Sequence, residues 1–151
     1  MSDVIKRCDD NILTQSSPET EKACSTLYGL IADTTIPFDV PIKNTLHDGI
    51  YVRTAFLPKG TTGLGCLLKV PTTLIISGEC LVSNGIAVAH SKGYAVLQGQ
   101  TLRRSFFYAI EDTYLSMIAK VNATTVDEAE KEVTDEWAIL TTRKDNNEKE
   151  T

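Results

Sequence analysis

Three arginines and two tyrosines are the residues of this chain whose types and spacing suit the binding of a ligand. Arg53 lies at strand spacing from Tyr51, so the two side chains are expected to share one face. Arg103 and Arg104 are adjacent, and in an alternating strand one of them must point inward. An inward guanidinium can hold an anion through two parallel hydrogen bonds, and Tyr51 or Tyr108 is available to stack on a ring. We therefore take these residues as candidate ligands of a small anion, such as a nucleotide or a sugar phosphate.

A structural ion pair is the alternative role for the arginines. Glu79 or Glu111 would then be the partner carboxylate. Glu79 has a further interpretation as a lone inward base, against the simpler one of a solvated or hydrogen-bonded carboxylate. The sequence leaves these alternatives open.

Histidines and cysteines are too few and too far apart to predict a metal site or a catalytic centre. The chain has two histidines, His47 and His90, and each fits a position at the rim or the surface. Its four cysteines form no C-x-x-C pair, which argues against a zinc knuckle or a redox motif. No Ser/His/Asp set and no phosphate-binding glycine loop occurs. We predict no catalytic residue, no metal, no cofactor and no enzymatic activity.

Charge and hydropathy exclude two further classes of partner. The net charge is −5 and the basic residues are scattered, whereas a nucleic-acid-binding protein needs a basic patch. No apolar run approaches the roughly 20 residues that span a bilayer. The N-terminus is polar and acidic where a signal peptide has an apolar core. We expect neither nucleic acid nor membrane as a partner, and a location in a cytoplasm or in a particle assembled there.

Short alternating segments separated by turn residues dominate the middle of the chain and predict an antiparallel sheet. Asn84-Gly85 is a strong signal for a hairpin, and Gly78 and Lys92-Gly93 are expected turns. No helical segments lie between the strands, so a sandwich or barrel is expected. The expected strands span 49–60, 64–70, 72–77, 79–83, 85–90, 93–99, 101–110 and 113–121.

Further elements flank the expected sheet on both sides. Residues 1–43 predict an arm that leads into a helix at 16–33. Thr125 and Glu128 form a capping-box pattern that predicts a helix over 125–140. The expected division is an arm and helix at 1–43, a jelly roll at 44–122, and a helix with an acidic mobile tail at 123–151.

The order of glycines, prolines and charged residues over 44–121 resembles a small cupin-type jelly roll of the kind that many bacteriophage genomes encode. The pattern has a G-x-Y-x-R strand that leads to a P-K-G turn, then glycines between strands, then an E-D-T strand that closes the roll. The matching positions are Gly49, Tyr51, Arg53, Pro58, Lys59, Gly60, Gly65, Gly78, Gly99, Arg103 or Arg104, Glu111, Asp112 and Thr113. The resemblance implies a mainly β protein, a small antiparallel jelly-roll barrel with an N-terminal arm and helix and a C-terminal helix.

The chain departs from that pattern where the family holds its metal. Cupin metal sites resemble one another in using two or three histidines and a carboxylate that face into the barrel. Between Gly65 and Gly78 this chain has no histidine, and Leu68, Val70 and Thr72 occupy the neighbourhood. A site with three nitrogen ligands cannot be assembled from two histidines. We therefore do not expect a metal-dependent cupin enzyme.

Two functions remain open at this point. The first is a non-catalytic assembly or interaction protein, a bacteriophage virion component or accessory factor that acts as a homo-oligomer or with other phage proteins. The second is a binding module for a small anionic ligand, which a phage could use against host defence. Either function places the protein in the host cytoplasm or the virion.

Overall fold

A computed structural model of the chain describes residues 5–7, 12–13, 18, 22, 40–83 and 88–138. Its strands and helix are β1 (Ile5–Arg7), β2 (Ile12–Leu13), β3 (Ile42–His47), β4 (Ile50–Leu57), β5 (Thr62–Leu64), β6 (Thr72–Ser83), β7 (Val88–Gly99), β8 (Phe106–Ala109), β9 (Thr113–Lys120) and α2 (Val126–Val133). The predicted helix at 16–33, apart from Pro18 and Lys22, lies outside the described residues, as do the Asn84-Gly85 turn and the acidic tail from residue 139 onward.

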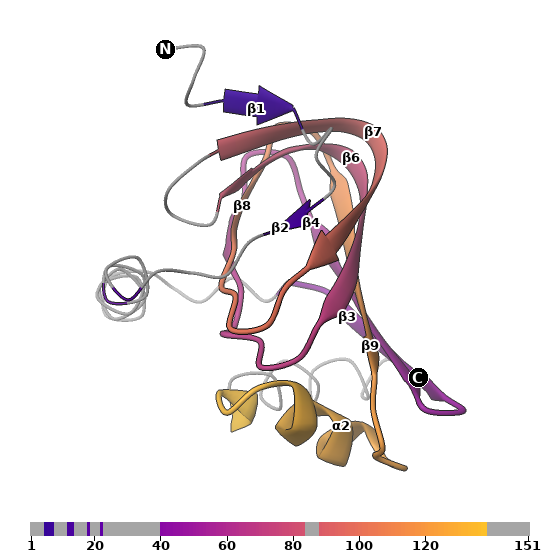
Figure 1. Cartoon of the computed structure of the whole chain (residues 1–151). Helices are drawn as coiled ribbons and strands as arrows, with labels where there is room; N and C mark the ends of the chain where they lie inside the picture. The colour runs from indigo at the N-terminus through magenta and orange to yellow at the C-terminus, as the bar shows by residue number, and fades with distance from the viewer. Residues whose placement is uncertain are drawn as a thin grey trace.

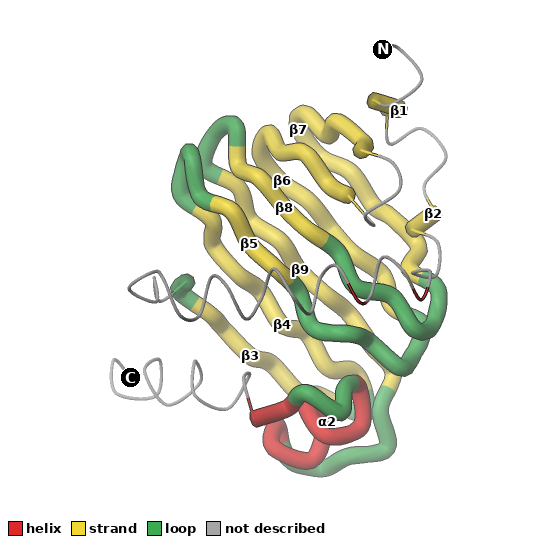
Figure 2. Tube along the Cα trace, turned by 90° about the vertical axis from the view of Figure 1, so that its left-hand side faces the viewer, coloured by secondary structure: helices red, strands yellow, loops and turns green. Residues whose placement is uncertain are grey.

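The strands form one sheet that curls into a half-barrel, in the order β1-β7-β6-β9-β4-β3 (Figure 1). All pairs from β3 to β9 are antiparallel, while the short strands β1 and β2 pair parallel with β7. Figure 2 shows β1 and β2 beside β7 at one edge of the sheet and β3 at the other edge. The predicted class, a mainly β antiparallel jelly roll, is confirmed. Within the described residues, no helix is long and apolar enough to cross a membrane.

Strand β6 continues through Gly78, where the sequence predicts a turn. Its first half pairs with β9 and its second half with β8, so the strand changes partner at this residue. Gly78 has φ +136°, and a Cβ there would overlap the carbonyl oxygen of Asp112 and the side chain of Thr113. Strand β7 likewise runs unbroken through Lys92-Gly93, opposite Glu79 and Gly78. Both predicted turns are therefore bends within long strands, because strand pairing on both sides outweighs the local turn preference.

The segments predicted as strands at 64–70 and 101–110 are largely irregular. Outside β5 and β8, the two segments are joined by the bridge of Leu68 with Arg103, with backbone bonds of 2.9 and 3.2 Å, and by the bond from Gly65 N–H to the carbonyl oxygen of Ser105 at 2.9 Å. Leu102 adopts a left-handed conformation with φ +53°, which breaks the alternation just before the two arginines. Arg103 and Arg104 are nevertheless both buried, so neither is the exposed partner that a regular strand alternation would give.

Helix α2 covers the end of the half-barrel near β3, β4 and β9 (Figure 1). Thr125 caps the helix as predicted, since its Oγ1 accepts the backbone N–H of Glu128 at 3.3 Å. The helix ends at Val133, earlier than predicted, because the backbone of Thr134 is extended. Helix and sheet share a core cluster made of Tyr51, Ala119, Val121, Ala129 and Val133. A second cluster fills the curl between the strands and contains Leu57, Leu74, Ile76, Cys80, Val82, Leu97, Ala109 and Leu115.

Candidate ligand-binding site

Arg53 lies on the concave face of the sheet together with Tyr51, as the alternation of β4 predicts. Tyr51 is fully buried and Arg53 is 8% exposed. The hydroxyl of Tyr51 donates to Oδ1 of Asn44 at 2.8 Å, and Nη1 of Arg53 donates to the same oxygen at 3.3 Å. Oε1 of Glu130, on α2, lies 3.7 Å from Nη1 of Arg53. Arg53 therefore has a carboxylate as counter-charge and a side-chain amide as hydrogen-bond acceptor.

Arg103 contacts the same concave face at β6, two strands away from Arg53. Its Nη2 donates to Oγ1 of Thr72 at 2.9 Å, and Thr72 shares the buried face of β6 with Leu74 and Ile76. Arg103 is 3% exposed, and within the described chain neither its Nε nor its Nη1 has a hydrogen-bond partner. None of the ion pairs among the described residues includes Arg103. A buried guanidinium is thus held by one hydroxyl.

The backbone of β7 makes room for the Arg103 guanidinium at Gly99. A Cβ at this position would overlap Nη1 and Cζ of Arg103 and lie close to Oγ1 of Thr72. Burial disfavours the charged form and lowers the pKa of Arg103 to about 10, so the side chain remains a cation at neutral pH.

A groove of about 750 Å³ opens beside the two residues that Arg103 contacts. Thr72 and Gly99 are part of its lining. The rest of the lining is mainly apolar, with Ile50, Pro71, Ile118 and Ala119, and its polar side chains include Gln98, Gln100 and Thr101. Amide and hydroxyl groups at the lining suit a small polar molecule, since they donate and accept hydrogen bonds without adding net charge.

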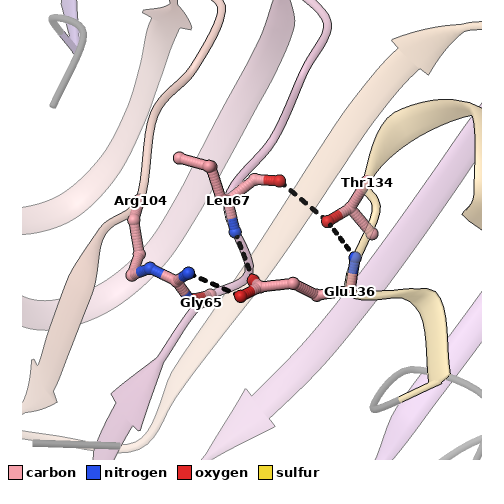
Figure 3. A network of polar contacts seen from close by, with 5 residues as sticks. All are labelled: Gly65, Leu67, Arg104, Thr134 and Glu136. Atoms are coloured by element: carbon pink, nitrogen blue, oxygen red, sulfur yellow. Dashed lines mark hydrogen bonds and ion pairs between the residues drawn. The ribbon is translucent and has the colours of Figure 1, made fainter. Parts of the chain in front are cut away.

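Arg104 has a structural partner. Its Nη2 lies 2.6 Å from Oε2 of Glu136, and its Nη1 donates to the carbonyl oxygen of Gly65 at 3.1 Å (Figure 3). Oε1 of Glu136 accepts the backbone N–H of Leu67 at 2.8 Å. Thr134 adds a bond from its Oγ1 to the carbonyl oxygen of Leu67 at 2.7 Å. Arg104 therefore fastens the segment after α2 to the loop before β6.

Tyr108 lies apart from the three arginines. It is 43% exposed and pairs with Thr62 and Leu81, while its neighbours Phe107 and Ala109 pack in the core. Its side chain therefore faces outward. Of the residues that the sequence suggests for one anion site, the structure places Tyr51, Arg53 and Arg103 on the concave face.

The carboxylates proposed as partners of the arginines pair elsewhere. Oε1 of Glu79 lies 2.9 Å from Nε2 of His90, and both side chains are partly exposed. Oε1 of Glu111 lies 3.3 Å from Nζ of Lys59, at the surface. The arginine partners are instead Glu130 and Glu136, both from the C-terminal part of the chain.

Glu130 carries a sequence signal that the prediction of a helix over 125–140 did not use. It follows Ala129 and stands between Val126 and Val133 at helical spacing, so it lies on the apolar stripe. A charged residue on such a stripe is expected to point inward toward a partner. Asn44 has a similar signal, since it stands between Ile42 and Leu46 at strand spacing, whereas Glu136 lies after the end of α2 and has no such periodic signal.

The donor set of a cupin metal centre is absent from the part of the chain that the structure describes. No group of three or more histidine, cysteine, aspartate or glutamate side chains comes together there. His90 is bonded to Glu79, and the positions expected to carry metal ligands hold Leu68, Val70 and Thr72. The residues present do not fit a transition metal of the kind that the resemblance implies.

No protein-family model and no curated protein matches the chain. Solved structures that match it include salicylate 1,2-dioxygenase from Pseudoaminobacter salicylatoxidans in an adduct with gentisate, at 16% identity and a TM-score of 0.50, over 80% of this chain and 37% of that chain. They also include a cupin superfamily protein from Desulfitobacterium hafniense, at 10% identity and a TM-score of 0.46, over 61% and 88% of the two chains. Ectoine synthase from P. lautus matches at 15% identity and a TM-score of 0.49, over 69% and 82%.

The chain has the cupin-type jelly-roll fold, and at these identities the likeness shows the fold alone. The matched structures correct the expected function, because they include enzymes such as salicylate 1,2-dioxygenase. The prediction of a non-catalytic assembly protein of a bacteriophage is therefore wrong, and so is the prediction that excludes enzymes. The bacteriophage origin finds no support in the matches.

Proposed function

We propose that this chain binds a small anionic molecule inside its jelly roll, with the guanidinium of Arg103 holding the negative charge. One observation carries this proposal: Arg103 is buried with two nitrogens that lack a partner among the described residues. The ligand class is a carboxylate or a phosphate, the two groups whose geometry fits a guanidinium.

The physical reason is the free energy of burying a charge. A cation taken out of water destabilises the folded protein unless an opposite charge and hydrogen bonds compensate it. Thr72 supplies one acceptor to Arg103, and no carboxylate in the described chain supplies the charge. An anionic ligand would supply both the charge and the missing acceptors.

The groove supports the proposal only by its position, because its lining includes Thr72 and Gly99, the two residues against which the Arg103 guanidinium lies. Tyr51 and Arg53 lie on the same concave face and are candidates for further contacts. Arg104 is engaged with Glu136, and Tyr108 faces away, so neither is part of the proposed site.

Isothermal titration calorimetry with butanoate, benzoate and inorganic phosphate tests the proposal. We expect at least one of these anions to bind the wild-type protein and to lose binding to Arg103→Met, a variant expected to fold because apolar residues replace buried charges well. Tyr108→Phe is the matched control and is expected to bind as the wild type does. Absence of binding by all three anions, or equal binding by Arg103→Met, would overturn the proposal.

A further inference from the structure

The two inward arginines differ in their electrostatic surroundings, and this difference bears on the chemistry of the ligand. Arg103 has a hydroxyl as its partner and no carboxylate in the described chain. Arg53 has Glu130, fully buried, with 3.7 Å between Nη1 and Oε1. The charge of Arg53 is thus balanced within the protein, whereas the charge of Arg103 is not.

Arg53 nevertheless retains a hydrogen-bond donor. Its Nη2 is buried and has no partner among the residues that the structure describes. Oδ1 of Asn44 already accepts from both Tyr51 and Nη1 of Arg53, which uses the two lone pairs of a carbonyl oxygen. A buried donor without an acceptor destabilises the protein, so a ligand oxygen at Nη2 would be favourable.

That oxygen should be neutral. A second anionic group beside Arg53 would share the guanidinium with the buried carboxylate of Glu130, and like charges in a site shielded from water repel strongly. A hydroxyl or carbonyl oxygen accepts from Nη2 without this repulsion.

We infer that the ligand is a hydroxy acid or an oxo acid, with its anionic group on Arg103 and its neutral oxygen on Nη2 of Arg53. This inference rests on the proposed function. Arg53 pairs with Met117, Met117 with Leu74, and Thr72 lies two residues before Leu74 on the same face. With the usual spacing of strands and residues, the Cα atoms of Arg53 and Thr72 are about 12 Å apart along the sheet, and its curl brings them closer. Because Nη2 of Arg103 donates to Thr72, the proposed ligand would span this stretch of the concave face from Arg103 to Arg53.

Calorimetry with matched acids tests the inference. The probes are butanoate and hexanoate, the same acids with a terminal hydroxyl, and the corresponding dicarboxylates. In the wild-type protein we expect the hydroxyl, at one of the two lengths, to raise the affinity about tenfold or more over both the plain acid and the dicarboxylate. Arg53→Lys keeps a cation beside Glu130 but loses the forked donor, so it should lose this tenfold preference and keep its affinity for the plain acid.

The outcomes separate the inference from the proposed function. Binding of plain acids without a gain from the hydroxyl at either length, or a preference for the dicarboxylate, would overturn the inference and leave the anion site at Arg103 intact. An equal loss of both kinds of acid in Arg53→Lys, with an unchanged thermal unfolding curve, would overturn it as well. Should Arg53→Lys fail to fold, the comparison of acids in the wild-type protein decides the matter alone. Failure of every acid to bind the wild-type protein would overturn both.

Discussion

Nη2 of Arg104 lies 2.6 Å from Oε2 of Glu136, and the other oxygen of this carboxylate accepts the backbone N–H of Leu67 (Figure 3). Arg104 is buried, while Glu136 is partly exposed. Burial alone would raise the pKa of Glu136, but the hydrogen bonds from Arg104 and Leu67 and the charge of Arg104 lower it below 4.5. One carboxylate thus joins three segments that are far apart in the sequence.

Glu136→Gln should reduce the free energy of unfolding by about 1–2 kcal/mol at pH 7, because it weakens a charge-assisted hydrogen bond at a partly exposed site. The pKa of Glu136 is lowered in the folded state, so its stabilising contribution is complete above 4.5 and is lost as the pH falls through the lowered value. The wild-type protein and the variant should therefore converge in strongly acidic buffer. Urea denaturation at both pH values measures this.

Asp135→Asn is the matched control for Glu136→Gln. Asp135 pairs with Lys69 at 2.8 Å, but its side chain is 84% exposed. Water and salt screen such a pair, so the variant should change stability little at either pH. A pH-independent difference between Glu136→Gln and the wild type would contradict the role assigned to the carboxylate.

The hydrophobic alternation of the sequence was sufficient to predict the sheet, and it failed at residues where tertiary contacts decide the backbone. Gly78 has the local preference of a turn residue, yet pairing of β6 with β7, β9 and β8 keeps it in a strand. Arg103 and Arg104 are both buried because Leu102 leaves the strand conformation just before them. Alternation cannot predict the direction of side chains in an irregular segment.

The sequence was sufficient to predict the arginines of the candidate site, but not the carboxylates that pair with them. Arg53 and Tyr51 share a face because a strand repeats every two residues, which the sequence displays directly. Glu130 and Glu136 reach the arginines only once α2 has folded over the end of the sheet, and the sequence sets no distance between these segments. Ion-pair partners from remote segments depend on the tertiary structure.

Gly99→Ala should destabilise the protein by about 1–3 kcal/mol, because the added methyl group overlaps the guanidinium of Arg103. It should also weaken binding of anions at that site. In the background of Arg103→Met the same change should be less destabilising, since the flexible methionine can move aside. Urea denaturation of both single variants and the double variant measures this coupling. An equal loss of unfolding free energy in both backgrounds would show that the added methyl group does not overlap the Arg103 side chain.

Anion binding should weaken as the pH rises through about 10, where the buried Arg103 loses its charge. The pKa is lowered in the folded state, so above about 10 the unfolded chain holds this proton more tightly than the folded protein does. The destabilisation caused by burying the charge therefore fades as the pH rises further. Calorimetric titrations from pH 7 upward measure the affinity, with circular dichroism to verify that the protein remains folded. Arg103→Lys should move the loss to lower pH, because burial lowers the pKa of lysine from a smaller starting value. Identical pH profiles for the wild-type protein and Arg103→Lys would show that the loss of anion binding comes from the titration of another group.

Glu130→Gln should invert the selectivity between hydroxy acids and dicarboxylates. The variant keeps the shape of the side chain but removes the carboxylate that lies 3.7 Å from Nη1 of Arg53. Arg53 then becomes a second buried cation without a counter-charge, so an anionic group should replace the neutral oxygen as its preferred partner. We expect the dicarboxylate to bind about tenfold more tightly than the hydroxy acid of equal length, as measured by calorimetry. Asp127→Asn, an exposed change of the same charge on α2, should leave the wild-type preference unaltered. An unchanged preference in Glu130→Gln, with the protein still folded, would show that Glu130 does not set the charge that Arg53 accepts.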